Sequence, residues 1–163
     1  MEYKRHYRMY GLVPYNISPI QQGIQFGHAV VEYGLENFEE FDYQQWASVD
    51  KTFIILNGGT TNTSLDTPGT LNEHRQELND NWINFSSFFE PDLGDQLTAV
   101  VFLVDDRVYD KKAFPDYAGP RNLMNGEPES RAYFEWLKQF SDDESEALRL
   151  VWLRHFLSQF RLA

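Results

Sequence analysis

Short apolar segments alternate with segments of helical spacing along this chain, and few folds accommodate that order. Residues 7–13, 51–56, 85–89 and 97–104 have the composition of buried β-strands. Helical segments separate the first three of these strands and follow the last one. Strands that alternate with helices favour an α/β fold whose sheet is at least partly parallel. We therefore expect a mixed four-stranded sheet with flanking helices.

The first helix has the clearest start signal in the chain. Ser18 is a good N-cap, Pro19 suits the first helical position, and Gln21 completes a capping box. Apolar residues continue at helical spacing as far as Val31, and Gly34 is a natural stop. We expect this helix to end at Gly34.

The remaining segments predict further helices and one irregular connection. Residues 110–130 are rich in proline and glycine, which predicts an irregular path. The turn between the last two strands allows an antiparallel pair or a crossover. We expect a core at residues 1–105 and a helical extension at residues 106–163 that packs on the same domain. Four other segments have helical or turn character: residues 38–49, 70–81, 133–140 and about 142–159.

The composition excludes several classes of protein. The 163 residues are 42% hydrophobic and 16% aromatic, which is enough to fill a core and excludes disorder of the whole chain. No run approaches the ~20 apolar residues of a membrane helix, so we expect no membrane partner. The absence of cysteine excludes disulfides and thiolate chemistry. It is compatible with the reducing cytoplasm, where we expect this protein, in the host cell if it is viral.

The charge balance limits the partners. Lys and Arg number 14 against 25 acidic residues, which gives a net charge of −11. A broad nucleic-acid-binding face needs clustered basic residues and is disfavoured, whereas one small anion in a local pocket is compatible. The four histidines are scattered, so we expect no metal site and no cofactor.

Two segments carry candidate catalytic residues. His28 lies in the first helix between two small residues, and packing of its ring against the sheet is an equally good interpretation. Asp92 lies in the turn before the most apolar strand, which Thr98 opens. A simple turn residue is the plainer interpretation of Asp92, and Glu90 and Asp95 are alternatives in the same turn.

A glycine-rich loop follows the second strand. Asn57, Gly58, Gly59 and Thr60 offer backbone N–H groups and polar side chains that can hold a phosphate or a ribose. The loop continues to Asn62, and it lacks the lysine and the spacing of a P-loop. A plain turn is the simpler interpretation.

Taken together, these segments resemble the type-2 peptidyl-tRNA hydrolase family over roughly residues 6–105. The segment Gln25-Phe26-Gly27-His28-Ala29 matches the family's Gln-x-x-His-Ala helix. The resemblance implies the same fold, and it places His28, Asp92 and Thr98 where the family has its active-site histidine, aspartate and threonine. Gln21 and Gln22 stand where the family has lysines, the turn carries the acidic Asp95, and the C-terminus is about 50 residues longer.

The chain is also similar to small proteins of tailed phages. The shared segments are Gly-Ile-Gln-x-Gly-His-Ala and Leu-Asn-Gly-Gly-Thr-Thr-Asn. Our leading hypothesis is a phage-type accessory, counter-defence protein that binds a small anionic nucleotide, such as an immune-signalling nucleotide. The ligand would lie at the N-terminus of the first helix. Six residues would line its site: Gln21, Gln25, Asn57, Gly58, Gly59 and Thr60.

The hypothesis leaves open whether the ligand is cleaved. If it is cleaved, His28 is the general base or acid, Asp92 orients it, and Thr98 positions water or the leaving group. One alternative is a genuine peptidyl-tRNA hydrolase, which the missing lysines and the negative charge disfavour, so tRNA is the weaker partner. Another is an acidic interaction or inhibitor module. In each case the aromatic content favours a homodimer, and a large core explains it equally well.

Overall fold

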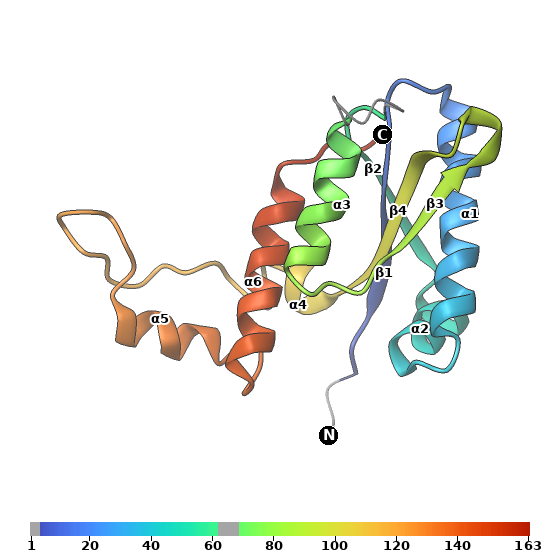
Figure 1. Cartoon of the computed structure of the whole chain (residues 1–163). Helices are drawn as coiled ribbons and strands as arrows, with labels where there is room; N and C mark the ends of the chain where they lie inside the picture. Colours follow the sequence, from blue (N-terminus) through green and yellow to red (C-terminus); the bar gives the residue numbers. More distant parts are fainter. Residues whose placement is uncertain (1–3, 62–68) are drawn as a thin grey trace. The chain divides into compact units, whose positions relative to one another are not determined.

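Four strands form one mixed sheet in the order β2-β1-β4-β3 (Figure 1). β1 (Tyr7–Val13) runs parallel to β2 (Thr52–Asn57). β4 (Gln96–Asp105) is antiparallel to β1 and to β3 (Ser86–Glu90). The two strands joined by the short turn therefore pair directly. The predicted α/β class, with a mixed four-stranded sheet and flanking helices, is confirmed.

The computed structural model describes residues 4–61 and 69–163, so Asn62 of the predicted loop lies outside the described residues. The chain divides into two compact units. The first contains the sheet and comprises Met1–Asp105 with Gln159–Ala163, and the second is Asp106–Ser158. The last five residues join the first unit through main-chain hydrogen bonds to β2, such as Ala163 N to Ile55 O at 2.9 Å. The expected packing of the extension on the same domain stays a prediction.

The helix α1 (Pro19–Asn37) begins where the sequence predicts, because Ser18 Oγ accepts a hydrogen bond from Gln21 N at 3.2 Å. It does not end at Gly34. A Cβ atom at Gly34 would lie 2.6 Å from the hydroxyl of Tyr43, so the glycine makes room for a side chain from the next segment. The predicted stop is wrong because a tertiary contact, and not a chain reversal, requires this glycine.

One face of the sheet packs against α1 in the core of the first unit. At Gly11 of β1 a Cβ atom would lie 2.2 Å from the ring of Phe26, so this glycine allows the close approach of helix and strand. The tight contact fixes the distance between α1 and the sheet at this point. The buried cluster between them consists of Met9, Val13, Phe26, Ala29, Tyr33, Trp46, Ala99 and Val101.

Figure 1 shows α1 and α3 on opposite faces of the sheet. The helix α3 (Thr70–Asp80) buries Leu71 and Leu78. Three short elements complete the first unit: α2 (Phe41–Gln45), the π-helix η1 (Trp46–Asp50) and the 3₁₀ turn η2 (Pro91–Leu93). Within residues 4–61 and 69–163, no helix is long and apolar enough to cross a membrane.

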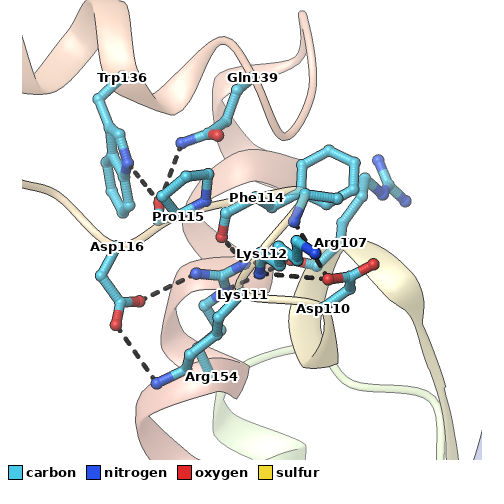
Figure 2. Close-up of polar contacts among 11 residues, drawn as sticks. Arg107, Asp110, Lys111, Lys112, Phe114, Pro115, Asp116, Trp136, Gln139 and Arg154 are labelled. Carbon is cyan, nitrogen blue, oxygen red and sulfur yellow. Dashed lines mark hydrogen bonds and ion pairs between the residues drawn. The ribbon is translucent and has the colours of Figure 1, made fainter.

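The second unit contains α4 (Asp106–Tyr109), α5 (Ser130–Leu137) and α6 (Glu144–Ser158), with an irregular connection between α4 and α5. The buried guanidinium of Arg154 organises this connection (Figure 2). It donates hydrogen bonds to the main-chain oxygens of Arg107 and Phe114 and pairs with Asp116 at 2.9 Å. One buried side chain thus holds a segment that has almost no regular structure of its own.

Candidate functional site

The start of α1 and the turn between β3 and β4 border a hollow of about 510 Å³. Figure 1 shows that turn beside the first residues of α1. Four of the predicted site residues meet here, namely Gln21, Gln25, His28 and Asp92. The remaining lining residues are Ile17, Ser18, Ile24, Glu90 and Leu93.

His28 is exposed and its ring is held in a defined plane. The imidazole stacks on the ring of Phe88, with centroids 4.4 Å apart and an angle of 16° between the planes. The ring therefore packs against the sheet, which was the structural interpretation left open for it, but the side chain stays exposed and borders the hollow. Because one face is covered and the side chain borders the hollow, the imidazole can exchange a proton with a bound molecule.

A chain of hydrogen bonds crosses the floor of the hollow. The buried hydroxyl of Thr98 donates to Gln25 Oε1 at 2.6 Å. The amide nitrogen of Gln25 donates to Glu90 Oε2 at 2.9 Å and to Gln21 Oε1 at 3.3 Å. These bonds fix the orientation of the Gln25 amide, because its oxygen must face a donor and its nitrogen an acceptor. Polar groups fixed in this way are preorganised for a ligand.

A β-bulge explains why Thr98 points toward α1. Phe88 lies opposite Ala99 and Phe89 lies opposite Leu97, so Thr98 has no partner residue on β3. An extra residue in one strand bends that strand and redirects its side chain. The sequence places Thr98 at the start of the strand, but the alternation of a regular strand does not predict the side on which it lies.

Glu90, and not Asp92, joins the network. Its second oxygen accepts a hydrogen bond from Asp92 N at 3.2 Å. The hydrogen bond from Gln25, the one from Asp92 N and the nearby His28 together lower the pKa of Glu90 below its usual range. Asp92 itself is exposed in η2, and no direct hydrogen bond joins it to His28 within the described part of the chain. The sequence indicates Glu90 only as an alternative to Asp92. Its position at the end of the strand is the feature that could have indicated its role.

The glycine-rich loop borders a different hollow, of about 330 Å³. Asn57, Gly58 and Gly59 line it, and Thr60 lines neither hollow. The structure therefore does not bring the two groups of predicted ligand residues into one pocket. Six other residues complete this second lining: Tyr15, Thr70, His74, Gln159, Phe160 and Arg161.

The backbone N–H groups of this loop already have acceptors inside the chain. Four donate to groups 2.8–2.9 Å away, so a phosphate in the loop would have to displace existing hydrogen bonds. The ligand role of these four residues stays a prediction and finds no support in this geometry. The pairs are Asn57 N with Arg161 O, Gly58 N with Val13 O, Gly59 N with Asn57 Oδ1, and Thr60 N with Thr70 Oγ1.

The charge of the first hollow is negative. Glu90 and Asp92 both line it, and no lysine or arginine is among the described residues of its lining. Two carboxylates disfavour a phosphate at the same place, because like charges repel in a partly desolvated site. Among the described residues, no group of three or more histidine and acidic side chains is arranged to hold a metal ion.

Comparison with protein-family models finds no match, and comparison with curated proteins finds none either.

Proposed function

We propose that the hollow beside His28 is a hydrolytic site for a nucleotide-derived ligand, which it holds by the uncharged parts of that ligand. The observation that carries this proposal is the exposed imidazole of His28 beside the fixed chain from Thr98 through Gln25 to Glu90. A base on the surface of a hollow with preoriented polar neighbours is the arrangement that general acid–base hydrolysis needs.

The lining favours a sugar or an acyl group over a phosphate. Carboxylates accept hydrogen bonds from ribose hydroxyls, and Glu90 and Asp92 are available for this. Ile17, Ile24 and Leu93 supply an apolar wall. The ligand's phosphates then remain outside the hollow, and its ester or sugar-linked bond lies inside, near His28.

In the proposed reaction His28 takes a proton from water as the water attacks the scissile bond. The Gln25 amide donates its two N–H groups to Glu90 and Gln21, so it holds the Glu90 carboxylate in place beside His28. Glu90 stabilises the imidazolium that forms, since the two side chains attract each other electrostatically. The proton returns from His28 to the leaving oxygen, which completes the cycle.

The resemblance to type-2 peptidyl-tRNA hydrolases supports an ester as the bond that is cleaved. Apart from the short elements α2, η1 and η2, the order of elements over residues 7–105 has the layout that this resemblance implies: strand, helix, strand, helix and two final strands. Binding of tRNA lacks comparable support. The basic residue Arg8, which could contact phosphates, lies opposite Val104 near the end of β4. The hollow lies at the other end of this strand, where β4 begins. The resemblance to phage proteins favours a nucleotide of host immune signalling as the natural ligand.

The test is a cleavage assay with purified protein, a panel of signalling nucleotides and one aminoacylated tRNA ester. We expect loss of one substrate with the wild type and at least about 100-fold slower loss with His28→Ala, the usual contribution of a general base. His155→Ala, which changes a histidine of the second unit, is the matched control and keeps full activity. Recovery of intact ligand after heat release would show a sequestering protein, and equal activity of His28→Ala would refute the proposal.

A further inference from the structure

The helix α1 has two apolar faces, and only one of them packs on the sheet. Phe26, Ala29 and Tyr33 are buried in the core. A helix on the surface of a small domain normally carries polar residues on its other face. On that side, α1 and its C-cap residue Phe38 instead carry large apolar side chains that are 44–77% exposed, here called the outer stripe: Ile20, Ile24, Val31, Leu35 and Phe38.

The outer stripe is continuous along the helix. Its residues are spaced by three, four or seven positions, which places them on one side of an α-helix. Gly27 occupies the turn between Ile24 and Val31, and a Cβ atom at Gly27 would meet no other atom within 4 Å. The middle of the stripe is therefore flat and open, so that another helix can approach closely.

The outer stripe is also self-complementary. Ile20 and Leu35 are equally far along the helix from the midpoint between Gly27 and His28, and so are Ile24 and Val31. Two antiparallel copies of α1 crossing at this midpoint place Ile20 opposite Leu35 of the partner subunit and Ile24 opposite Val31 of the partner subunit, and Phe38 lies outside these pairs. A two-fold symmetric interface requires this kind of self-complementarity.

The charges on α1 favour the antiparallel orientation. The helix contains no lysine or arginine, and its acidic residues, Glu32 and Glu36, both lie in the C-terminal half. Glu36 is held toward β3 by a hydrogen bond from Ser86 Oγ at 2.9 Å, so Glu32 carries this argument, because parallel helices would bring the two Glu32 carboxylates to the same level. Antiparallel helices bring each acidic half beside the uncharged N-terminal half of the other copy, where the helix dipole is positive.

The exposed area of the outer stripe is close to that of a small interface. From their exposed fractions, the five residues present roughly 600 Å² of accessible surface on each copy, where a standard interface buries roughly 800 Å² per partner. Complete burial of the stripe therefore reaches the low end of the range for specific association, and the polar side chains at its edges add to this area.

We propose that two copies of this chain associate through the outer stripe, with their α1 helices antiparallel around Gly27. This inference concerns assembly and does not depend on the proposed hydrolysis. It does affect the hollow, because Ile24 belongs to both surfaces. Val31 of the partner subunit then packs against Ile24 and completes one wall of the hollow.

A charge exchange tests both the surface and the orientation. Light scattering across a dilution series of the full chain should give twice the chain mass of 19.2 kDa. Ile20→Lys or Leu35→Glu alone should weaken association on the order of 100-fold, because each change enters a symmetric interface twice. Both changes in one chain should restore the dimer to within about tenfold of the wild type, since each lysine then faces a glutamate.

The control is Leu123→Glu, which introduces a charge at a fully exposed position outside the stripe and should leave the dimer intact. Circular dichroism checks that each variant is folded. A monomeric wild type at all concentrations overturns the proposal, as does dissociation caused by Leu123→Glu. A folded double variant that stays monomeric overturns the antiparallel orientation.

A cysteine experiment provides a second measurement, because the chain has no cysteine of its own. Mild oxidation of a chain carrying both Ile20→Cys and Leu35→Cys should give a covalent dimer. Ile20→Cys alone should give none, since the two copies of position 20 lie roughly 22 Å apart along antiparallel helices. Cross-linking of the single variant, or none with the double variant, contradicts the antiparallel pairing.

Discussion

Replacement of Gln25 with methionine removes the centre of the hydrogen-bond chain while keeping most of the side-chain volume. Gln25 is 2% exposed and Thr98 is fully buried, so the Thr98 hydroxyl loses its acceptor in a place that water does not reach. An unpaired buried hydroxyl costs about 1–3 kcal/mol. The Phe88 carbonyl, 3.4 Å from this hydroxyl, compensates in part, which leads us to expect a cost of about 1–2 kcal/mol.

A double-mutant cycle isolates this interaction. Thr98→Val removes the hydroxyl that Gln25→Met would leave unpaired, so the two changes together should cost less than the sum of the single changes, by about 1 kcal/mol. Thr61→Val is the matched control, because the buried Thr61 hydroxyl donates to Leu97 O and not to Gln25. Gln25→Met and Thr61→Val should be additive.

The assay is native-state hydrogen exchange of the β1 and β4 amides. It reports the free energy of opening of the first unit separately from the second. A non-additivity below about 0.3 kcal/mol for Gln25→Met with Thr98→Val would refute the conclusion that this hydrogen bond organises the hollow. An equal non-additivity in the Thr61→Val control would show a general loosening of the unit instead.

Three further predictions concern other contacts. The lowered pKa of Glu90 stabilises the fold above its unfolded pKa of about 4.5, and this contribution is lost as the pH falls through the folded pKa. In urea denaturation between about pH 5 and pH 3, the free energy of unfolding should therefore fall less steeply for Glu90→Gln than for the wild type. Equal slopes would contradict the pKa direction. Arg154→Met should lower the free energy of opening of the second unit by about 2–4 kcal/mol, measured by hydrogen exchange of α6, because two main-chain oxygens lose their donors. The control Lys138→Met, at an exposed position, should stay within about 0.5 kcal/mol of the wild type. Gly11→Ala should cost about 1–3 kcal/mol in chemical denaturation because its Cβ has no space against α1, and Gly23→Ala, at an open helical position, should be neutral or stabilising. A tolerated alanine at position 11 would show that the helix shifts freely on the sheet.

The elements that sequence reasoning predicted correctly have local signals. β1 ends before a proline, and α1 begins at Ser18 and Pro19, where the cap and the fixed φ angle act within one turn. Gly34 carries the same local signal as a helix stop, but its space is occupied by Tyr43 from the following segment. A glycine that serves a tertiary contact cannot be distinguished by spacing from a glycine that ends a helix.

The candidate site was predicted only in part, for a similar reason. His28 and Gln25 share a helix, so their common side follows from helical geometry. The bond from Gln25 to Glu90 joins residues 65 positions apart, and the orientation of Thr98 depends on a bulge. The sequence predicts a loop whose Gly58 and Gly59 amides are free to bind a ligand. In the structure these amides donate to Val13 O and to Asn57 Oδ1. These contacts depend on strand register, which one sequence does not specify.

Nuclear magnetic resonance of labelled protein tests directly whether the ligand binds beside His28. The probes are the His28 ring, the Gln25 side-chain amide and, for the second hollow, the Gly58 and Gly59 amides. When the substrate found in the cleavage assay is added, we predict large shifts of the His28 and Gln25 signals and unchanged Gly58 and Gly59 signals. Shifts confined to Gly58 and Gly59 would place the ligand in the other hollow and contradict the proposed site.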